Sequence, residues 1–488
     1  MKTYIGIDLG TSAAKLILAD AEGRILNTVT KTYPVSYPHE GWSEQNPDDW
    51  LDAVKSGIGE LLAESDGADV KGIGAGGQMH GLVALDGDDR VIRPCILWND
   101  GRTEKQTEYL NAHVGKNKLS SLTANIAFAG FTAPKLMWLK ENEPENFARI
   151  KRIMLPKDYI TYRLTGVHAT DYSDAAGTLL LDVKNRRWSE DMCRLTGISA
   201  SVLPTLFESY DKVGKLKSKY EKLWNVSDVC VCAGASDNAA AAIGTGTVDD
   251  GDCNISLGTS GTVFVAQNKF SVDSNNALHS FCHANGKFHL LGCILSAAAC
   301  NGWWMNILNT DDYKTEQSGA EDMLGDNEVF FLPYLVGERS PHNDVNARGA
   351  FLGLTPVSTR KHMTLAVMEG VAFALNDCLE RARENGLKIS RTKICGGGAK
   401  SALWRKIIAN VCNAEVQVPT IEEGPAYGAA ILAMTACREY ETVNEACKKL
   451  CKTSDIILPD RKIVEKYAVK YKKFTELYPA LKGVFNGK

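Results

Sequence analysis

One short pattern occurs twice in this chain, about half its length apart. The segment IDLGTSAAKLIL begins at Ile7 and ISLGTSGTVFVA begins at Ile255, so five of their first six residues coincide at an offset of 248. Each copy has an apolar strand pattern, a Gly-Thr-Ser turn and a second run rich in strand-forming residues. Because a chain of 488 residues also exceeds what one core usually serves, we expect two similar halves.

The segment after each turn limits which nucleotide-binding folds are compatible. Rossmann and P-loop glycines lead into a helix whose N-terminus holds the phosphate. Here each turn leads into a second strand, and neither copy contains a Rossmann or P-loop motif. A hairpin tip can still hold phosphate, because glycine lets the backbone approach and N–H and hydroxyl groups point at the oxygens.

The two copies differ at one chemically important position. The first carries Asp8 where the second carries Ser256. Two acids facing the same phosphates would repel them, whereas one acid can hold a magnesium ion through water. We therefore expect the halves to close over one nucleotide, with metal chemistry from the first copy and phosphate contacts from the second.

A third glycine cluster follows a short strand pattern in TKICGGGAKSALWRKIIANVC, residues 392–412. After the three glycines, apolar residues recur at helical spacing from Leu403 to Val411. A floor of glycine would let a flat base or a ribose lie close to the backbone. A plain loop is the alternative interpretation.

Two segments consist almost entirely of small residues: AGASDNAAAAIGTG at 233–246 and GPAYGAAILA at 424–433. Both are expected to be helices that pack backbone to backbone, as a hinge between two halves requires. Asp237 is the one acid in the first segment. It is either an N-cap, which accepts from the free N–H groups of a first turn, or a functional carboxylate in the cleft.

Composition excludes several classes of function. The net charge is −4 with both signs scattered, so no basic stripe favours nucleic acid, and we interpret the lysines at 466–473 as a solvated helix face. No apolar run approaches a membrane span, and no signal peptide pattern is present. The 14 cysteines lack a zinc pattern and suggest thiols in the cytoplasm. In HSFCH, at 279–283, we expect a structural role rather than a metal site.

Taken together, these residues resemble the FGGY carbohydrate kinases, of the actin-like, ribonuclease-H-like ATPase superfamily, over essentially the whole chain. The segments at 130–142 and 349–375 are similar to the two family signatures. Within the family, the likeness is greatest to members that phosphorylate D-xylulose. It is carried by GWSEQNPDDW (41–50), GQMHG (77–81), LWNDGR (97–102), MLPKDY (154–159), SDAAGT (173–178) and FLPYLVGERSPHND (331–344). One departure is Ser236, where that branch commonly has glycine.

The resemblance implies an α/β fold of two ribonuclease-H-like lobes with a cleft between them. Residues 1–245 would form the N-terminal sugar-binding lobe and residues 246–488 the C-terminal nucleotide-binding lobe. The implied reaction is ATP-dependent phosphorylation of D-xylulose with Mg²⁺, and the implied partners are the sugar and ATP, without nucleic acid or membrane. The oligomeric state stays open, a homodimer included.

The resemblance also implies roles for individual residues. Asp237 would take the proton from the attacking sugar hydroxyl, since an Asp is ionised at pH 7 and can accept it. Asp8 would hold magnesium through water, with Asp237 as a second metal candidate. The other implied contacts are Gly10, Thr11, Gly258 and Thr259 for phosphates, Gly397, Gly398 and Ser401 for adenosine, and Met79, His80, Asn238 and Trp98 for the sugar.

Other interpretations remain open from sequence alone. Met79 and His80 could be ordinary core residues. The substrate could be ribulose, gluconate or glycerol, although GQMHG favours D-xylulose. A nucleotide-gated, actin-like binding protein without a small substrate is a second class, and a dehydrogenase is disfavoured because a Rossmann βα turn is missing.

Overall fold

Both copies of the repeated pattern fold into the expected hairpins. In the computed structural model, which describes residues 1–65 and 67–487, β1 (Lys2–Leu9) and β2 (Ala13–Asp20) form the first antiparallel pair. The second pair is β16 (Cys253–Leu257) and β17 (Gly261–Gln267). The Gly-Thr-Ser tips connect strand to strand, as predicted.

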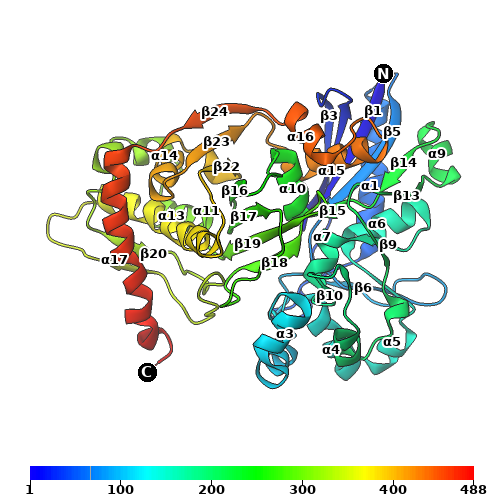
Figure 1. Ribbon diagram of the computed structural model, residues 1–488, viewed down its shortest axis with the longest axis horizontal. Coiled ribbons are helices and arrows are strands. Elements are labelled where there is room, and N and C mark those ends of the chain that lie inside the picture. Colours follow the sequence, from blue (N-terminus) through cyan, green and yellow to red (C-terminus); the bar gives the residue numbers. More distant parts are fainter. Residues whose placement is uncertain (66, 488) are drawn as a thin grey trace.

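Each hairpin is the centre of a seven-stranded sheet, and the two sheets share one topology. In the first, β3, β2 and β1 are antiparallel neighbours, and β5 and β14 continue the sheet in parallel. In the second, β19, β17 and β16 are antiparallel, and β22 and β23 follow in parallel. The sequence repeat therefore extends to whole sheets, which confirms the expected two-lobed α/β fold (Figure 1).

The other strands lie in these two sheets and in small two-stranded sheets within the connections. Their bounds are β3 Ile25–Thr32, β4 Glu44–Gln45, β5 Asp69–Gly77, β6 Val83–Leu85, β7 Cys95–Ile96, β8 Arg152–Met154, β9 Ala169–Asp171, β10 Leu181–Asp182, β11 Arg187–Trp188, β12 Thr205–Phe207, β13 Lys212–Lys215, β14 Cys230–Cys232, β15 Ala235–Ser236, β18 His279–Cys282, β19 Phe288–Ile294, β20 Phe330–Leu332, β21 Ala350–Leu352, β22 Arg391–Cys395, β23 Glu415–Pro419 and β24 Thr453–Ile457.

Helices cover the sheets and fill the connections between strands. Their bounds are α1 Pro47–Ala63, α2 Glu104–Tyr109, α3 Lys116–Thr123, α4 Thr132–Asn142, α5 Pro144–Arg149, α6 Pro156–Thr165, α7 Tyr172–Ala175, α8 Glu190–Thr196, α9 Ser218–Trp224, α10 Asp237–Thr245, α11 Ala298–Ile307, α12 Tyr313–Gln317, α13 Arg360–Glu384, α14 Ala402–Val411, α15 Gly424–Ala436, α16 Val443–Leu450 and α17 Arg461–Phe485.

The two small-residue segments form α10 and α15, which pack backbone to backbone as expected. A Cβ added at Gly428 would lie 1.8 Å from the Ala240 carbonyl oxygen, and one at Gly244 would lie 2.0 Å from the Gly424 oxygen. Real side-chain carbons do not approach a carbonyl so closely. Only glycine therefore permits this separation between the helices.

Helix α15 comes from the second half of the chain but packs on the first sheet. In Figure 1 it lies beside the blue strands β1 and β5. A Cβ at Gly6 would lie 1.9 Å from the Ala426 oxygen, and one at Gly74 would lie 2.1 Å from the Ala429 oxygen. The letters G-x-G-x-x-G do occur at 72–77, but they lie inside β5. The glycines at 72 and 74 accommodate this helix backbone, and the motif is not a Rossmann turn.

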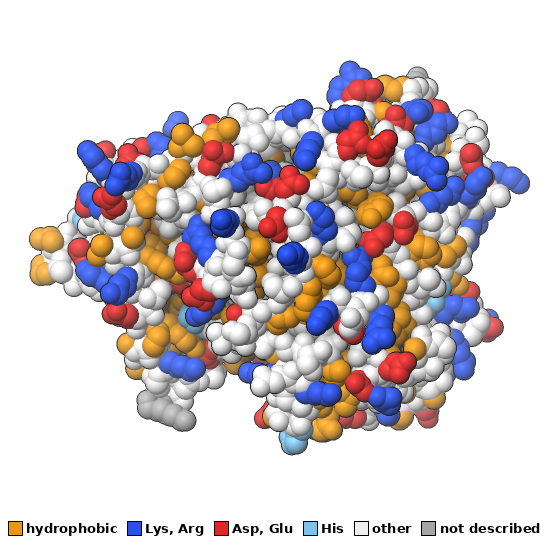
Figure 2. Space-filling view, in the orientation of Figure 1, with side chains coloured by type: hydrophobic (Ala, Val, Ile, Leu, Met, Phe, Trp, Pro, Cys, Tyr) orange, Lys and Arg blue, Asp and Glu red, His pale blue; other side chains and the backbone are white. Residues whose placement is uncertain are grey.

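The surface, the helices and the cysteines bear on the expectations drawn from composition. Basic and acidic side chains intermingle on the face shown in Figure 2. No helix among the described residues is long and apolar enough to cross a membrane, and all 14 cysteines are free. One expectation was wrong: Lys470 is buried and pairs with Glu369 at 2.6 Å, because α17 turns this side chain into the second core.

Candidate active site

A cavity of about 260 Å³ collects residues from both halves of the chain. From the first half it is lined by Met79, His80, Trp98, Gly130, Phe131, Asp237 and Asn238. From the second half it is lined by Ser256, Gly258, Ser260, Thr262, His279, Phe281, Leu291, Cys293 and Arg339. The cavity thus unites the catalytic acid and the sugar residues expected from sequence with the second hairpin.

Asp237 is the first residue of α10 and lines this cavity. The N-cap of the helix is Ser236, and its side chain makes no capping hydrogen bond. Asp237 Oδ1 accepts from the Asn238 backbone N–H at 2.6 Å and from Asn238 Nδ2 at 2.9 Å. Burial raises the pKa of Asp237 to about 6, although the Asn238 donors oppose this. The helix therefore does not use Asp237 as its N-cap, and the carboxyl is a stronger base than a solvated Asp.

Asp8 lies near the end of β1 and shares an electrostatic environment with Asp237. Burial and repulsion by Asp237 raise the pKa of Asp8 to about 7, while Lys15 opposes the shift. Lys15 stands opposite Asp8 in the hairpin register, yet its ammonium pairs with Glu423 at 2.6 Å. A carboxylate whose ionisation is disfavoured by a second carboxylate suits a divalent cation, which would relieve the repulsion.

The described residues do not include a group of three His, Cys, Asp or Glu side chains that could hold a metal ion. A cation at Asp8 and Asp237 would therefore need water and phosphate oxygens to complete its shell. This fits magnesium, which usually keeps several waters and binds through one or two carboxylates plus phosphates. In the HSFCH segment, residues His279–Cys282 form strand β18, and His279 lines the cavity.

Met79 and His80, the residues expected to contact the sugar, both line the cavity. His80 adopts a left-handed backbone conformation (φ 70°), and its Nδ1 lies 2.6 Å from the Gly177 carbonyl oxygen. Because a carbonyl only accepts, Nδ1 carries the proton and Nε2 has a free lone pair. Burial lowers the pKa of His80 well below its usual value, so the ring is neutral. It can accept a hydrogen bond from a sugar hydroxyl, whereas Met79 presents an apolar surface.

The two hairpin tips are held differently. At the first, the Thr11 hydroxyl accepts from Trp98 Nε1 at 3.0 Å, and the Gly10 carbonyl accepts from the Tyr33 hydroxyl at 2.5 Å. At the second, the Gly258 and Thr259 carbonyls accept from backbone N–H groups at the start of α11, at 2.8 and 2.9 Å. Gly258 lines the cavity directly, whereas Thr11 is connected to it through its hydrogen bond with Trp98.

The glycine cluster at 396–398 borders a second cavity, of about 450 Å³. Gly396 has φ 90°, and a Cβ there would lie 2.7 Å from the backbone of Leu257, so glycine brings this turn against the second hairpin. Gly397 lines the cavity, as expected for an adenosine contact. Gly398 packs on Leu257 and Trp404, and the Ser401 hydroxyl accepts from the Trp404 N–H as the N-cap of α14. Neither is among the lining residues.

Among the residues of the first cavity that sequence reasoning missed are Arg339 and His279. Arg339 is the one Lys or Arg among the lining residues described, and its guanidinium lies over the Phe128 ring at 5.2 Å. Its backbone is fixed by buried Glu338, whose Oε1 accepts from the Leu295 and Arg339 N–H groups at 2.9 and 2.7 Å. The segment at 331–344 was the available signal, but it does not reveal which side chain reaches the cavity.

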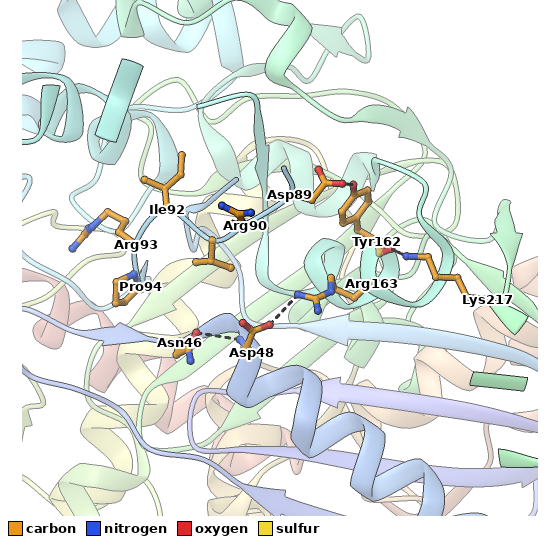
Figure 3. Close-up of a pocket in the computed structure, with 11 residues that line it drawn as sticks. Asn46, Asp48, Asp89, Arg90, Ile92, Arg93, Pro94, Tyr162, Arg163 and Lys217 are labelled. Atoms are coloured by element: carbon orange, nitrogen blue, oxygen red, sulfur yellow. Dashed lines mark hydrogen bonds and ion pairs between the residues drawn. The ribbon is translucent and has the colours of Figure 1, made fainter. Parts of the chain in front are cut away.

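A larger cavity, of about 690 Å³, opens elsewhere in the first half, beside α1 and α6 (Figure 3). Its carboxylates are already engaged: Asp48 pairs with Arg163 at 2.9 Å, and Asp89 accepts from the Tyr162 hydroxyl at 2.6 Å. None of the expected site residues lines it. We therefore place the chemistry in the smaller cavity around Asp237.

Comparisons with known proteins agree with this geometry. Residues 3–244 match the N-terminal domain of the FGGY family of carbohydrate kinases, and residues 253–437 match its C-terminal domain. A xylulose kinase of Escherichia coli is 40% identical over 481 residues, covering 98% of this chain and 99% of that protein.

Solved structures are similar over the same length. A "xyloylose kinase" from Brucella ovis has 39% identity and a TM-score of 0.95, with 99% of this chain and 100% of that chain covered. A gluconate kinase from Lactobacillus acidophilus has 28% identity and a TM-score of 0.95, with 100% and 99% covered. The expected two-lobed architecture is therefore shared with solved kinases of more than one sugar acceptor.

Proposed function

This chain belongs to the FGGY family of carbohydrate kinases and is an ATP-dependent sugar kinase; on that basis, we propose that it converts D-xylulose to D-xylulose 5-phosphate. The observation that carries the proposal is the sharing of one cavity by Asp237, His80 and Met79. Similarity to xylulose kinases over nearly the whole chain supports the choice of sugar.

In the proposed reaction, Asp237 is the general base. The sugar hydroxyl oxygen attacks the γ-phosphorus, a new O–P bond forms, and the P–O bond to the departing ADP breaks. The hydroxyl proton passes to an Asp237 carboxylate oxygen. A pKa of about 6 leaves this carboxyl largely ionised at pH 7, yet makes it a better proton acceptor than a solvated Asp.

The side chains around Asp237 orient the sugar. His80 Nε2 accepts from one hydroxyl, Asn238 lies beside the base, and Met79 packs on the apolar face of the sugar. The Asn238 amide also approaches Met79 Sδ at 3.7 Å, so these residues form one connected wall. Trp98 is the remaining sugar-side candidate from the first half.

Magnesium is part of the proposal, with Asp8 as its carboxylate, through water, and Asp237 as the second. When bound, it would neutralise phosphate oxygens and favour departure of ADP. The raised pKa of Asp8 supports a cation there, since Asp237 disfavours ionisation of Asp8 and a cation would relieve that repulsion. Gly10, Thr11, Gly258 and Thr259 would contact the phosphates.

The proposed division of labour follows the repeat. Residues 1–245 bind the sugar and residues 246–488 bind most of the nucleotide, with Gly397, Gly398 and Ser401 near the adenosine. Gly397 in the wall of the second cavity supports this, whereas Gly398 and Ser401 would act by shaping the turn. We further propose that the protein works in the cytoplasm, where its 14 free thiols would stay reduced.

Gluconate is a second candidate substrate, favoured by one observation. Arg339 brings a positive charge to the sugar cavity, and a guanidinium pairs well with a carboxylate. A coupled assay of ADP release with D-xylulose, L-ribulose, D-gluconate and glycerol distinguishes the candidates. We expect the highest kcat/KM for D-xylulose, and a higher value for any other acceptor would contradict the proposal.

A further inference from the structure

Four buried ionisable side chains lie next to the segment that carries Asp237. They are Lys157 and Asp158 of the MLPKDY motif, with Asp171 and with Asp174 of the SDAAGT motif. Lys157 Nζ lies 2.5 Å from Asp158, 3.0 Å from Asp171 and 3.7 Å from Asp174. Replacing buried ion pairs with apolar residues is often neutral or stabilising, so stability alone explains such a cluster poorly.

Asp171 is the hub of this cluster. Its Oδ1 faces Lys157, while its Oδ2 accepts three hydrogen bonds. The donors are the Ser173 backbone N–H at 2.8 Å, the Ser173 hydroxyl at 2.5 Å and the Ser209 hydroxyl at 2.7 Å. All these side chains are buried, so the two serines are held in fixed orientations.

The two serines also hold two of the three residues that precede Asp237. The Ser236 backbone N–H donates to the Ser173 hydroxyl at 3.1 Å, and the Gly234 N–H donates to the Ser209 carbonyl at 3.0 Å. On its other side the segment pairs with β5, where a Cβ at Gly234 would lie 2.0 Å from the Ala75 oxygen. The start of α10 is thus fixed from both sides.

We propose that Asp171 and Ser173 are positioning residues for Asp237. The Asp171 carboxylate fixes the orientation of the Ser173 hydroxyl. That hydroxyl in turn holds the Ser236 N–H, one residue before the base. Phosphoryl transfer depends on positioning more than on covalent chemistry, and a displacement of about 1 Å can cost two orders of magnitude. The inference rests on the proposed role of Asp237.

Ser209 supplies a matched control for Ser173. Ser173→Ala and Ser209→Ala each remove one hydroxyl donor to the same Asp171 oxygen, but only Ser173→Ala releases the Ser236 N–H. The Ser209 contact to Gly234 uses a backbone carbonyl and survives the substitution. Both variants should melt at similarly lowered temperatures.

The kinetic outcomes separate the inference from the proposed function. We expect kcat to fall about 10- to 100-fold in Ser173→Ala and less than about twofold in Ser209→Ala, with the KM for ATP unchanged in both. Ser173→Thr keeps the hydroxyl and should retain most of kcat. If Ser173→Ala does not fold, Ser173→Cys replaces it, since a thiol fills the space but accepts hydrogen bonds weakly.

Asp237→Asn is assayed in parallel. Full activity of that variant would overturn the proposed base itself. If Asp237→Asn loses activity while Ser173→Ala and Ser209→Ala lose kcat by the same factor, the base stands and the positioning role is wrong.

Discussion

At the scale of single residues, the carboxyl groups that suit the proposed chemistry of the candidate site also destabilise the folded protein. Asp8 and Asp237 both ionise less readily than a solvated Asp, because burial removes water and Asp237 repels charge on Asp8. An acid with a raised native pKa stabilises the fold only while it is protonated. The same groups that suit a cation and a base therefore destabilise the empty cleft at neutral pH.

Replacing Asp8 with Asn tests this cost. The unfolded pKa is near 3.8 and the folded pKa about 7, so the stability that protonated Asp8 contributes is full below pH 3.8 and lost as pH rises to about 7. At pH 8 without metal or nucleotide, Asp8→Asn should be more stable than the wild type by on the order of 1 kcal/mol, after discounting for partial exposure. Urea unfolding at pH 5 should show a smaller gain; an equal gain at both pH values contradicts the argument.

Asp237→Asn separates base from structure. Asn keeps the size of the side chain but accepts no proton, so kcat should fall about 10²- to 10⁴-fold, or roughly 3–5 kcal/mol of barrier. The melting temperature should stay the same or rise. Steady-state assays and thermal melts of one preparation provide the comparison, and retained kcat would falsify the role of Asp237.

His80→Ala should affect the sugar rather than the nucleotide. The variant loses one hydrogen bond from a substrate hydroxyl, worth about 1–3 kcal/mol. The sugar kcat/KM should therefore fall roughly 5- to 150-fold, with ATP binding unchanged by titration. An unaltered kcat/KM would return His80 to a core role.

At the scale of elements, glycine packing fixes how α10, α15 and the first sheet fit together. Helix α15 is apolar all round, and such a helix is expected to be buried. Nothing in its sequence says which sheet buries it. The hairpins, α10 and α14 could be predicted because strand alternation, helical spacing and turn chemistry are local signals. The sheet on which α15 packs and the positions of His279 and Arg339 in the cavity could not be predicted. They depend on contacts between segments that are far apart in the sequence.

Local signals also could not predict which residues of the glycine cluster line the second cavity: Gly397 does, whereas Gly398 and Ser401 do not. A serine between a glycine turn and a helix suits both a ligand contact and an N-cap. Ser401 is such a residue, and its hydroxyl caps α14. The sequence pattern identified the turn and Gly397. It could not show which residues of the turn line the cavity and which only stabilise the turn.

Two glycine-to-alanine changes test the helix packing. In Gly428→Ala, the new Cβ meets the Ala240 carbonyl at 1.8 Å, so the helices must separate at a cost of about 3 kcal/mol or more. Gly59 in α1 is the control, because a Cβ there has nothing within 4 Å. Gly59→Ala should stabilise the protein by about 0.5–1 kcal/mol. Equal urea midpoints for the two variants would show that the close contact is unimportant.

At the scale of the whole molecule, two halves built on sheets of one topology both contribute residues to one cavity. The proposed sugar contacts Met79 and His80 come from the first half and Gly258 from the second, so a ligand that contacts both walls should stabilise the closed arrangement. The meeting of α10 with α15 is the expected hinge, since small residues let the helices slide without bulky side chains interlocking.

Closure should be visible in solution. With D-xylulose and a non-hydrolysable ATP analogue together, small-angle scattering should give a smaller radius of gyration than the protein alone. Sugar and analogue added separately are the controls for partial closure. Superimposable curves under all conditions would indicate a rigid cleft.

The crossing of α15 onto the first sheet also bears on how the protein is made. Strand β1 is synthesised long before α15, because the helix that covers β1 and β5 ends only at Ala436. Until that residue has been synthesised, the small-residue face of the first sheet lacks its cover. The first half therefore cannot reach its final packing as an independent unit during translation, and its folding must wait for nearly the whole second half.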